Sequence, residues 1–240
     1  MTVTIHVPTV WHDLECGGYT ADLPLWREIA GREDGPVLDV GAGTGRVARD
    51  LSARRHAVTA LDLDEGLLGS LSERDPEVET VVGDARDFDL GGRRYGLILA
   101  PMQTVQLLGG RDGRMAFLRR ARAHLTPGGL LSAALTGEIE IFDEAFPLPD
   151  PDVTEQAGRT FTSQPVVQRE QDGRVVIKRF REIDGPGREY SHEVDVVHLD
   201  VVEIDEFEAE AAAEGFGVEP RRMIGPTEEH VGSVVVMLRG

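Results

Sequence analysis

The sequence predicts an α/β protein with a doubly wound, mostly parallel sheet of seven strands and an antiparallel β insert after the fifth strand. In the first half of the chain, short apolar runs typical of buried strands alternate with segments whose apolar residues have helical spacing. After Thr136 the pattern changes to alternating polar and apolar residues between turn sequences, which is typical of antiparallel strands. The insert is therefore expected inside the domain, between the fifth strand and the last helix.

The first half of the chain is expected to form five strands and four helices. The strands are Val37–Val40, Val58–Leu61, Val78–Val82, Tyr95–Ala100 and Leu130–Leu135. The helices are Tyr19–Ala30, Thr44–Arg54, Glu65–Glu73 and Arg111–Leu125, the last of which is followed by the helix-stopping sequence Thr126-Pro127-Gly128-Gly129.

The second half is expected to hold a loop, three antiparallel strands and the elements that close the domain. Glu138–Asp152 is expected to be a loop with a short helix or strand. The antiparallel strands are Gln164–Glu170, Arg174–Ile183 and Tyr190–Val202, with turns at Asp172-Gly173 and Asp184-Gly185-Pro186-Gly187. The closing elements are a helix at Ile204–Gly215 and strands at Gly217–Arg222 and Ser233–Leu238. We divide the chain into residues 1–137 (N-terminal helix and ligand-binding part), 138–203 (insert) and 204–240 (closing helix and strands).

Acidic residues outnumber basic ones by 43 to 25, which gives a formal net charge of −18. The excess is concentrated after residue 137, where the net charge is −14. Such a surface repels phosphate backbones and anionic lipid, so nucleic-acid and membrane partners are disfavoured. The alternative interpretation is that the acidic residues only keep the protein soluble. The single cysteine, Cys16, and an N-terminus without a secretory signal indicate a cytoplasmic protein.

A glycine turn joins the first strand to the next helix, in the sequence Val37-Leu38-Asp39-Val40-Gly41-Ala42-Gly43-Thr44-Gly45. Glycine permits positive φ and lets a ligand approach the backbone. The spacing is G-x-G-x-G, whereas the dinucleotide fingerprint G-x-G-x-x-G would need a glycine at Arg46, and no Walker lysine follows. A sheet protein in which these glycines only form tight turns is the simplest alternative.

Two carboxylates are expected at the same sheet edge as the glycine turn. Asp62 ends the second strand, 21 residues after Gly41, and Asp84 follows the third strand. An acidic residue at that distance from the glycines accepts hydrogen bonds from the hydroxyls of a ribose, and ligands of open α/β sheets bind at the carboxyl ends of the strands. The three strand ends therefore predict one site of nucleoside size.

With these motifs, most of residues 19–240 resembles the class I S-adenosylmethionine-dependent methyltransferases. The resemblance implies a Rossmann-like methyltransferase fold with S-adenosylmethionine as co-substrate. It places Gly41, Gly43 and Gly45 at the methionine and ribose, and Asp62 at the ribose hydroxyls. At the adenine it places Leu63 against the ring, Asp84 as the acceptor of the amine, and the Ala85 amide facing the ring. Asp39 would organise the loop and reach the methionine amino group through water. The full set of expected cofactor-binding residues is Asp39, Gly41, Ala42, Gly43, Gly45, Asp62, Leu63, Asp84, Ala85 and Tyr19.

The acceptor is expected to be a small molecule that is methylated at N or O. Methyltransferases that act on nucleic-acid bases commonly carry Asn/Asp/Ser-Pro-Pro-aromatic after the fourth strand, whereas this chain has Ala100-Pro101-Met102-Gln103. The insert is similar to the lids of glycine N-methyltransferase and of aminosugar N,N-dimethyltransferases. A lid of this kind excludes water from the reacting groups.

The expected catalytic residues are His192, Tyr190 and Gln103. Along a strand, Tyr190 and His192 share one face, and a histidine can act as a base near neutral pH. A structural role for each histidine is the alternative. The sequence has no metal-ligand spacing and no second cysteine, so no metal is expected.

Other functions remain open from the sequence alone. The chain could instead be a non-catalytic S-adenosylmethionine-binding regulator or partner subunit, or an RNA or protein methyltransferase. A closed lid over the methyl group would favour the small-molecule enzyme over both. A second copy of the chain, forming a homodimer, is a further candidate partner.

Overall fold

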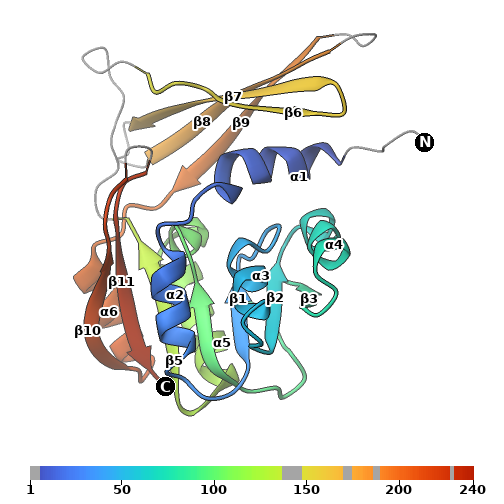
Figure 1. The fold of residues 1–240 in the computed structure, drawn as a ribbon. Helices are drawn as coiled ribbons and strands as arrows, with labels where there is room; N and C mark the ends of the chain where they lie inside the picture. Colours follow the sequence, from blue (N-terminus) through green and yellow to red (C-terminus); the bar gives the residue numbers. More distant parts are fainter. Residues whose placement is uncertain (1–5, 137–147, 170–174, 186–189, 228–229) are drawn as a thin grey trace. The chain divides into compact units, whose positions relative to one another are not determined.

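The computed structural model describes residues 6–136, 148–169, 175–185, 190–227 and 230–240 (Figure 1). These form two compact units, Tyr19–Glu138 with Val202–Gly240 and Met1–Gly18 with Ile139–Val201. We call the first the main unit and the second the insert unit. This division places the N-terminal residues with the insert. The division expected from the sequence places them with the ligand-binding part instead. Among the described residues, no helix is long and apolar enough to cross a bilayer.

The main unit is built on a seven-stranded sheet in the order β10-β11-β5-β4-β1-β2-β3. Neighbouring strands are parallel from β5 to β3, whereas β11 runs antiparallel to both β5 and β10. The predicted fold class is therefore confirmed. The strands are β1 (Val37–Val40), β2 (Val58–Asp62), β3 (Glu79–Val82), β4 (Tyr95–Ala100), β5 (Leu125–Leu135), β10 (Gly217–Ile224) and β11 (Ser233–Arg239).

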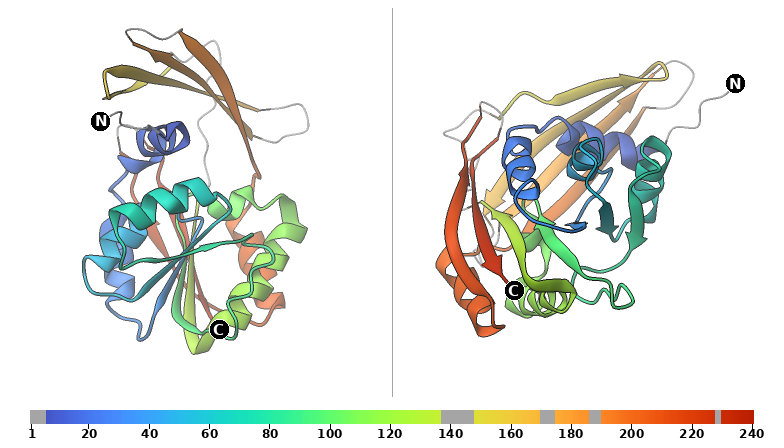
Figure 2. Two further views of the ribbon diagram at one scale, coloured as in Figure 1. Left: turned by 90° about the vertical axis from the view of Figure 1, so that its right-hand side faces the viewer. Right: turned by 60° about the horizontal axis from the view of Figure 1, so that its bottom comes forward.

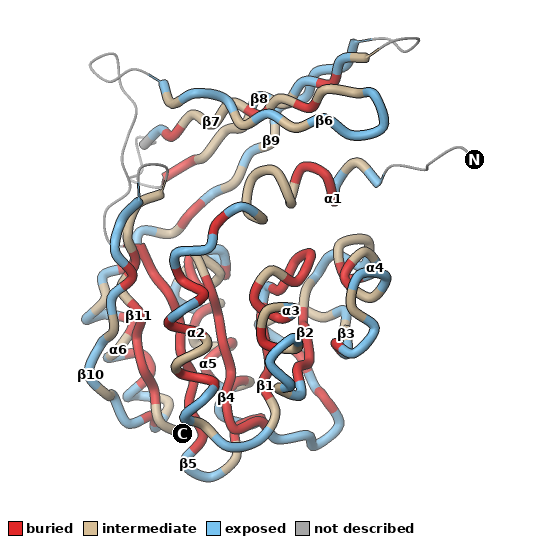
Figure 3. The backbone as a smooth tube through the Cα atoms, in the orientation of Figure 1, coloured by how far each residue is buried: buried red, intermediate tan, exposed pale blue. Residues whose placement is uncertain are grey.

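Helices cover both faces of this sheet, because successive strand residues point to opposite sides (Figures 1 and 2). One buried cluster joins α2, α3 and α4 to residues such as Val37 and Leu97, and a second joins α5 and α6 to residues such as Leu38 and Ile98. Figure 3 shows the central strands as buried along their length. The helices are α2 (Leu23–Ala30), α3 (Arg46–Ser52), α4 (Glu65–Arg74), η2 (Thr104–Leu107), α5 (Gly110–His124) and α6 (Ile204–Ala213).

The insert unit contains a four-stranded antiparallel sheet in the order β6-β7-β8-β9. The predicted three strands are present, and β6 at the edge is an additional one that the sequence analysis missed. The strands are β6 (Asp152–Gln156), β7 (Arg159–Arg169), β8 (Val175–Asp184) and β9 (Ser191–Leu199). The predicted turn at Asp172-Gly173, residues 186–187 of the second turn and most of the Glu138–Asp152 loop lie outside the described residues.

An N-terminal helix packs on one face of the insert sheet. It comprises α1 (Val7–His12) and a π-helical turn, η1 (Asp13–Gly17). The Trp11 ring meets the Phe161 ring edge-on, with centroids 5.1 Å apart. The largely buried Glu15 accepts two hydrogen bonds from Arg181, at 2.7 and 2.6 Å, and one from the Ser163 hydroxyl at 2.8 Å. This cluster explains why the N-terminal residues belong to the insert unit.

Replacing Glu15 with Gln should loosen the N-terminal helix from the insert sheet. The change leaves the Arg181 guanidinium without its buried anion, and breaking such a pair costs about 3 kcal/mol. Hydrogen exchange of the ligand-free protein should show faster exchange in residues 7–17, with unchanged protection in β1 and β4.

The matched control is Glu193→Gln, because Glu193 also lies near Arg181, at 3.5 Å, but its side chain is 56% exposed. The substitution Glu193→Gln should destabilise the contact between the N-terminal helix and the insert sheet by less than about 1 kcal/mol. Equal effects of the two substitutions would contradict a dominant role for Glu15.

Candidate active site

The glycine turn adopts a backbone that only glycine takes without strain. Gly41, Gly43 and Gly45 have φ values of 71°, 55° and 82°, all in the left-handed region. The amides of Gly41 and Ala42 donate to the carbonyl of Leu61, at 2.8 and 3.1 Å, and so hold the turn against the end of β2. The predicted turn at the carboxyl edge of the sheet is thus present.

Asp62 holds three neighbouring segments together at this edge. Its carboxylate accepts a hydrogen bond from the Gly43 amide at 2.8 Å and another from the Asp64 amide at 2.9 Å. Its carbonyl accepts from the Gly83 amide at 2.9 Å, which fixes the end of β3. The structure therefore brings Asp62 to the glycine turn, as the 21-residue spacing predicts, and gives it an organising role in the loop.

The residues expected at the adenine follow the ends of β2 and β3. Leu63 is an exposed apolar side chain, and Ala85 is partly buried against the core. Asp84 is engaged by Arg86, which donates from Nε and Nη2 at 2.9 and 2.6 Å; this side-chain hydrogen bond holds the pKa of Asp84 below its usual value. Asp84 is thus a carboxylate, and the adenine contact remains a prediction.

Arg46 joins the glycine turn to the segment before α2, a contact that the sequence analysis missed. Its guanidinium donates to both carboxylate oxygens of Asp22, at 2.5 and 2.7 Å, and to the Tyr19 carbonyl at 2.8 Å. The two side chains are only 10% and 1% exposed. Trp26 donates its indole N–H to the same Asp22 at 2.8 Å. The 24-residue separation of Asp22 and Arg46 leaves no local pattern from which this pair could be recognised.

Tyr19 is buried beside this ion pair. The Arg46 guanidinium lies 5.2 Å from the centre of the Tyr19 ring, and the His230 ring stacks on it with centroids 4.6 Å apart. Within the described ranges, the Tyr19 hydroxyl has no hydrogen-bond partner. Burial, followed by the negative charge of Asp22, raises the pKa of this hydroxyl, so Tyr19 presents a neutral phenol.

Asp39 is a carboxylate buried in β1, directly before the glycine turn. Neither of its side-chain oxygens has a hydrogen-bond partner among the residues that the structure describes. Burial is the main cause that raises the pKa of Asp39 to about 7; Arg46 and the nearby Ala48 amide oppose the rise, while Asp62 and Asp22 add to it. The Ala48 backbone amide lies close enough to stabilise the ionised form of Asp39, but it does not form a full hydrogen bond with either carboxyl oxygen.

These features fit the methionine and ribose ends of S-adenosylmethionine. An unpartnered buried carboxylate and an unpartnered buried hydroxyl favour a cationic, hydrogen-bonding ligand, because buried polar groups are otherwise paired. The left-handed glycines permit close backbone approach. The expected site residues of the main unit are thus consistent with this co-substrate, and their individual contacts to it stay predictions.

Two of the three expected catalytic residues belong to the insert unit. The rings of Tyr190 and His192 lie 6.1 Å apart on one face of the sheet, opposite to the face that holds Glu15. The side chain of Glu182 hydrogen-bonds Tyr190, and Glu182 pairs with His192 across β8 and β9. This hydrogen bond is the largest cause that raises the pKa of the exposed Tyr190.

The third, Gln103, belongs to the main unit and lies directly before η2, in the loop after β4; its side chain makes no capping hydrogen bond to η2. Its neighbour Met102 has a φ of 54°, a strained value for a side chain with a Cβ. Gln106 is buried and fastens η2 to the end of β5, accepting from the Thr136 amide at 2.9 Å and donating to its carbonyl at 3.3 Å. The structure therefore supports a structural role for Gln106.

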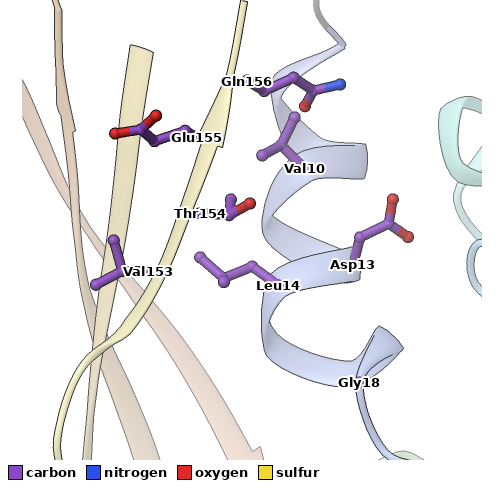
Figure 4. Close-up of a pocket in the computed structure, with 8 residues that line it drawn as sticks. All are labelled: Val10, Asp13, Leu14, Gly18, Val153, Thr154, Glu155 and Gln156. Atoms are coloured by element: carbon purple, nitrogen blue, oxygen red, sulfur yellow. The ribbon is translucent and has the colours of Figure 1, made fainter. Parts of the chain in front are cut away.

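A shallow pocket of about 440 Å³ lies within the insert unit (Figure 4). It is lined by α1, η1 and β6, and its acidic residues are Asp13 and Glu155. It contains none of the residues predicted for cofactor or catalysis. In the described part of the chain, no group of three or more His, Cys, Asp or Glu side chains is arranged to hold a metal ion.

Comparisons with known proteins identify the class of enzyme. Residues 37–129 match the model of a methyltransferase domain family. A dTDP-3-amino-3,6-dideoxy-α-D-glucopyranose N,N-dimethyltransferase of Streptomyces fradiae is 27% identical over 183 residues, which cover 76% of this chain and 70% of that protein. The dTDP-3-amino-3,4,6-trideoxy-α-D-glucopyranose N,N-dimethyltransferase of Streptomyces venezuelae is 28% identical over 187 residues, 78% of this chain and 77% of that protein.

Solved structures give the same result for the whole fold. The crystal structure of DesVI from Streptomyces venezuelae has a TM-score of 0.72 at 25% identity, covering 98% of this chain and 99% of that chain. The structure of S-adenosylmethionine-bound CalS10 from Micromonospora echinaspora, an amino pentose methyltransferase, has a TM-score of 0.72 at 22% identity, covering 100% and 99%. The chain is a class I S-adenosylmethionine-dependent methyltransferase. It is similar to the sugar N,N-dimethyltransferases within that family.

Replacing Asp62 with Ala should weaken binding of S-adenosylmethionine by about 1.5–3 kcal/mol, because hydrogen bonds to a charged group are lost. The loop also loses the acceptor of the Gly43 amide. Calorimetric titration measures the change. Asp87→Ala is the control, since Asp87 follows the neighbouring strand but pairs with Arg120; its affinity should match that of the wild type. Unchanged affinity in Asp62→Ala would place the ribose elsewhere.

The Asp39 carboxyl should make the ligand-free protein less stable as pH rises. Its pKa is about 7 when folded and about 3.9 in an unfolded chain, so between these values the native state holds the extra proton. The free energy of unfolding then falls by about 1.4 kcal/mol per pH unit in that window and levels off above it.

Asp39→Asn removes this dependence. Urea titrations at pH 5 and pH 7 measure the free energy of unfolding of the variant and of the wild type. The value for the variant minus that for the wild type should increase by about 2–3 kcal/mol from pH 5 to pH 7. A difference that stays constant with pH would contradict the burial of Asp39 as a neutral acid.

Proposed function

We propose that this methyltransferase transfers the methyl group of S-adenosylmethionine to the amino nitrogen of a sugar carried on a nucleoside diphosphate. The observation that carries the proposal is the agreement among curated relatives. Three of them are N,N-dimethyltransferases of dTDP-linked deoxyaminosugars, the third being 33% identical over 94 residues and from Saccharopolyspora spinosa. Two of the three align over more than three quarters of this chain, so the likeness extends beyond the cofactor motifs.

The residues at the carboxyl edge of the main sheet would bind and orient the co-substrate. S-adenosylmethionine supplies an activated methyl group on a positively charged sulfur. Asp62 would accept from the ribose hydroxyls, Leu63 would lie on the adenine, and Asp39 and Tyr19 would face the methionine end. The ordered loop matters because methyl transfer depends chiefly on holding the nucleophile in line with the methyl carbon.

The acceptor amine must be neutral to attack, because only its free lone pair can form the new bond. The N–C bond forms as the C–S bond breaks, and the methylated ammonium then loses a proton to a base or to water. A second cycle at the same nitrogen gives the dimethylamine. His192, with Tyr190 and Glu182 beside it, is the proposed proton acceptor, and Gln103 is the proposed hydrogen-bond partner of the acceptor.

Incubation with S-adenosylmethionine and dTDP-3-amino-3,6-dideoxyglucose should give products heavier by one and two methyl groups, as measured by mass spectrometry. The parallel samples contain the dTDP sugar with a hydroxyl in place of the amine, an RNA pool and a protein extract. Methylation of the amine alone supports the proposal. Methylation of the hydroxyl sugar, RNA or protein, with none on the amine, would contradict it, as would tight cofactor binding without turnover on any aminosugar.

Replacing His192 with Ala should lower turnover of a confirmed acceptor by about 10²-fold while leaving cofactor affinity unchanged. The effect should fall on kcat. His198→Ala is the control, because His198 is also exposed on β9 and on the same face. Its turnover should equal that of the wild type. Equal turnover in both variants would assign proton removal to another residue or to water.

The remaining expectations on partners and location follow from the proposed acceptor. A nucleotide-linked sugar is a soluble metabolite, so we propose a cytoplasmic enzyme with no nucleic-acid, membrane or metal partner. A homodimer is also proposed, and light scattering of the purified protein measures it directly.

A further inference from the structure

Asp39 is a buried acid that the proposed chemistry does not use as a catalytic group. It is 1% exposed, and neither carboxylate oxygen has a hydrogen-bond partner in the part of the chain that the structure describes. Buried carboxylates are costly unless they are paired or neutral. Its position in β1, two residues before Gly41, makes it part of the cofactor site and not of the general core.

The charged groups around Asp39 do not provide it with a cation of its own. In the part of the chain that the structure describes, Arg46 of α3 is the one positive neighbour among them, and its guanidinium already binds both oxygens of Asp22, the acid that precedes α2. Asp62 at the end of β2 is the third acid, with its oxygens accepting from two backbone amides. With all groups ionised, three carboxylates would share one guanidinium.

On the basis of the proposed use of S-adenosylmethionine, we propose that Asp39 carries a proton in the ligand-free enzyme and releases it when the methionine end of the co-substrate binds. S-adenosylmethionine brings a sulfonium and an ammonium group together with one carboxylate, a net charge of about +1. The neutral Asp39 acid and this cation become an Asp39 carboxylate with the bound cation, and one proton passes to solvent. Nothing else is oxidised, reduced or consumed.

The electrostatics of the site agree with this coupling. Burial is the main cause that raises the pKa of Asp39 to about 7; Arg46 and the Ala48 amide act in the opposite direction, and the negative charges of Asp62 and Asp22 add smaller increases. An added cation acts as Arg46 does and lowers this pKa. Because only the ionised form pairs with the cation, affinity for S-adenosylmethionine should rise as pH increases from 5.5 and level off near 7.

The number of protons released is measured by calorimetry. S-adenosylmethionine is titrated into the enzyme at pH 6.0 in several buffers that differ in their ionisation enthalpy. The observed binding enthalpy is plotted against the ionisation enthalpy of the buffer, and the slope gives the number of protons released. The expected result is release of about one proton at pH 6.0 and close to none at pH 8.0, where Asp39 is already ionised.

Two variants make the assignment to Asp39. Asp39→Asn should bind with no proton release at pH 6.0, whereas Asp150→Asn, which changes an exposed aspartate of the insert unit, should release as many protons as the wild type. Equal release by wild type and Asp39→Asn would overturn the inference. Binding without release by the wild type would overturn it as well and leave the proposed function intact. Failure of S-adenosylmethionine to bind the wild type would overturn both.

A direct titration avoids dependence on the folding of the variant. In the ligand-free protein with ¹³C-labelled aspartate carboxyls, one carboxyl signal should titrate near pH 7 and should report the ionised form at pH 6.0 after S-adenosylmethionine is added. If every aspartate carboxyl of the ligand-free protein titrates below about pH 5, Asp39 is ionised before binding and the inference is wrong.

Discussion

The ion pair between Arg46 and Asp22 is the interaction on which the proposed cofactor site depends. Arg46 begins the helix after the glycine turn, and Asp22 precedes the helix that covers the same face of the sheet. Their two short hydrogen bonds, together with the bond from Arg46 to the Tyr19 carbonyl, fix the segment before α2 against the turn. Breaking a buried pair of this kind costs about 3–5 kcal/mol, because the remaining charge is left unpaired.

The same pair determines the electrostatics of the site. Because Asp22 occupies the Arg46 guanidinium, Asp39 has a nearby positive charge, but neither of its carboxyl oxygens has a hydrogen-bond partner among the described residues. Tyr19 packs beside the pair, and its hydroxyl has no hydrogen-bond partner in the same part of the chain. Left-handed glycines and unpaired buried groups are unfavourable in the isolated protein. Departures from local rules of this kind concentrate at binding sites, where a ligand offsets their cost.

The parts of the fold that follow local periodicity could be predicted from the sequence. The strands β1, β2 and β4 are short, mostly apolar runs, and Asp62 is located by its spacing from Gly41. The strand β6 could not be predicted, since its five residues are mostly exposed. Gly96 lies so close to the loop before β1 that a Cβ there would overlap the Asp34 carbonyl oxygen. That constraint comes from a backbone approach that no sequence pattern reports.

Contacts between distant residues account for the rest of what the sequence could not provide. Glu15 meets Arg181 across 166 residues, which assigns the N-terminal helix to the insert unit. The central claim is that the turn at Gly41–Gly45 and Asp62 form the S-adenosylmethionine site. A crystal structure of the enzyme with S-adenosylhomocysteine tests it most directly. The account predicts ribose hydroxyls within hydrogen-bond distance of the Asp62 carboxylate and an amino group on the Asp39 side of the turn; density for the nucleoside at any other edge of the sheet would contradict it.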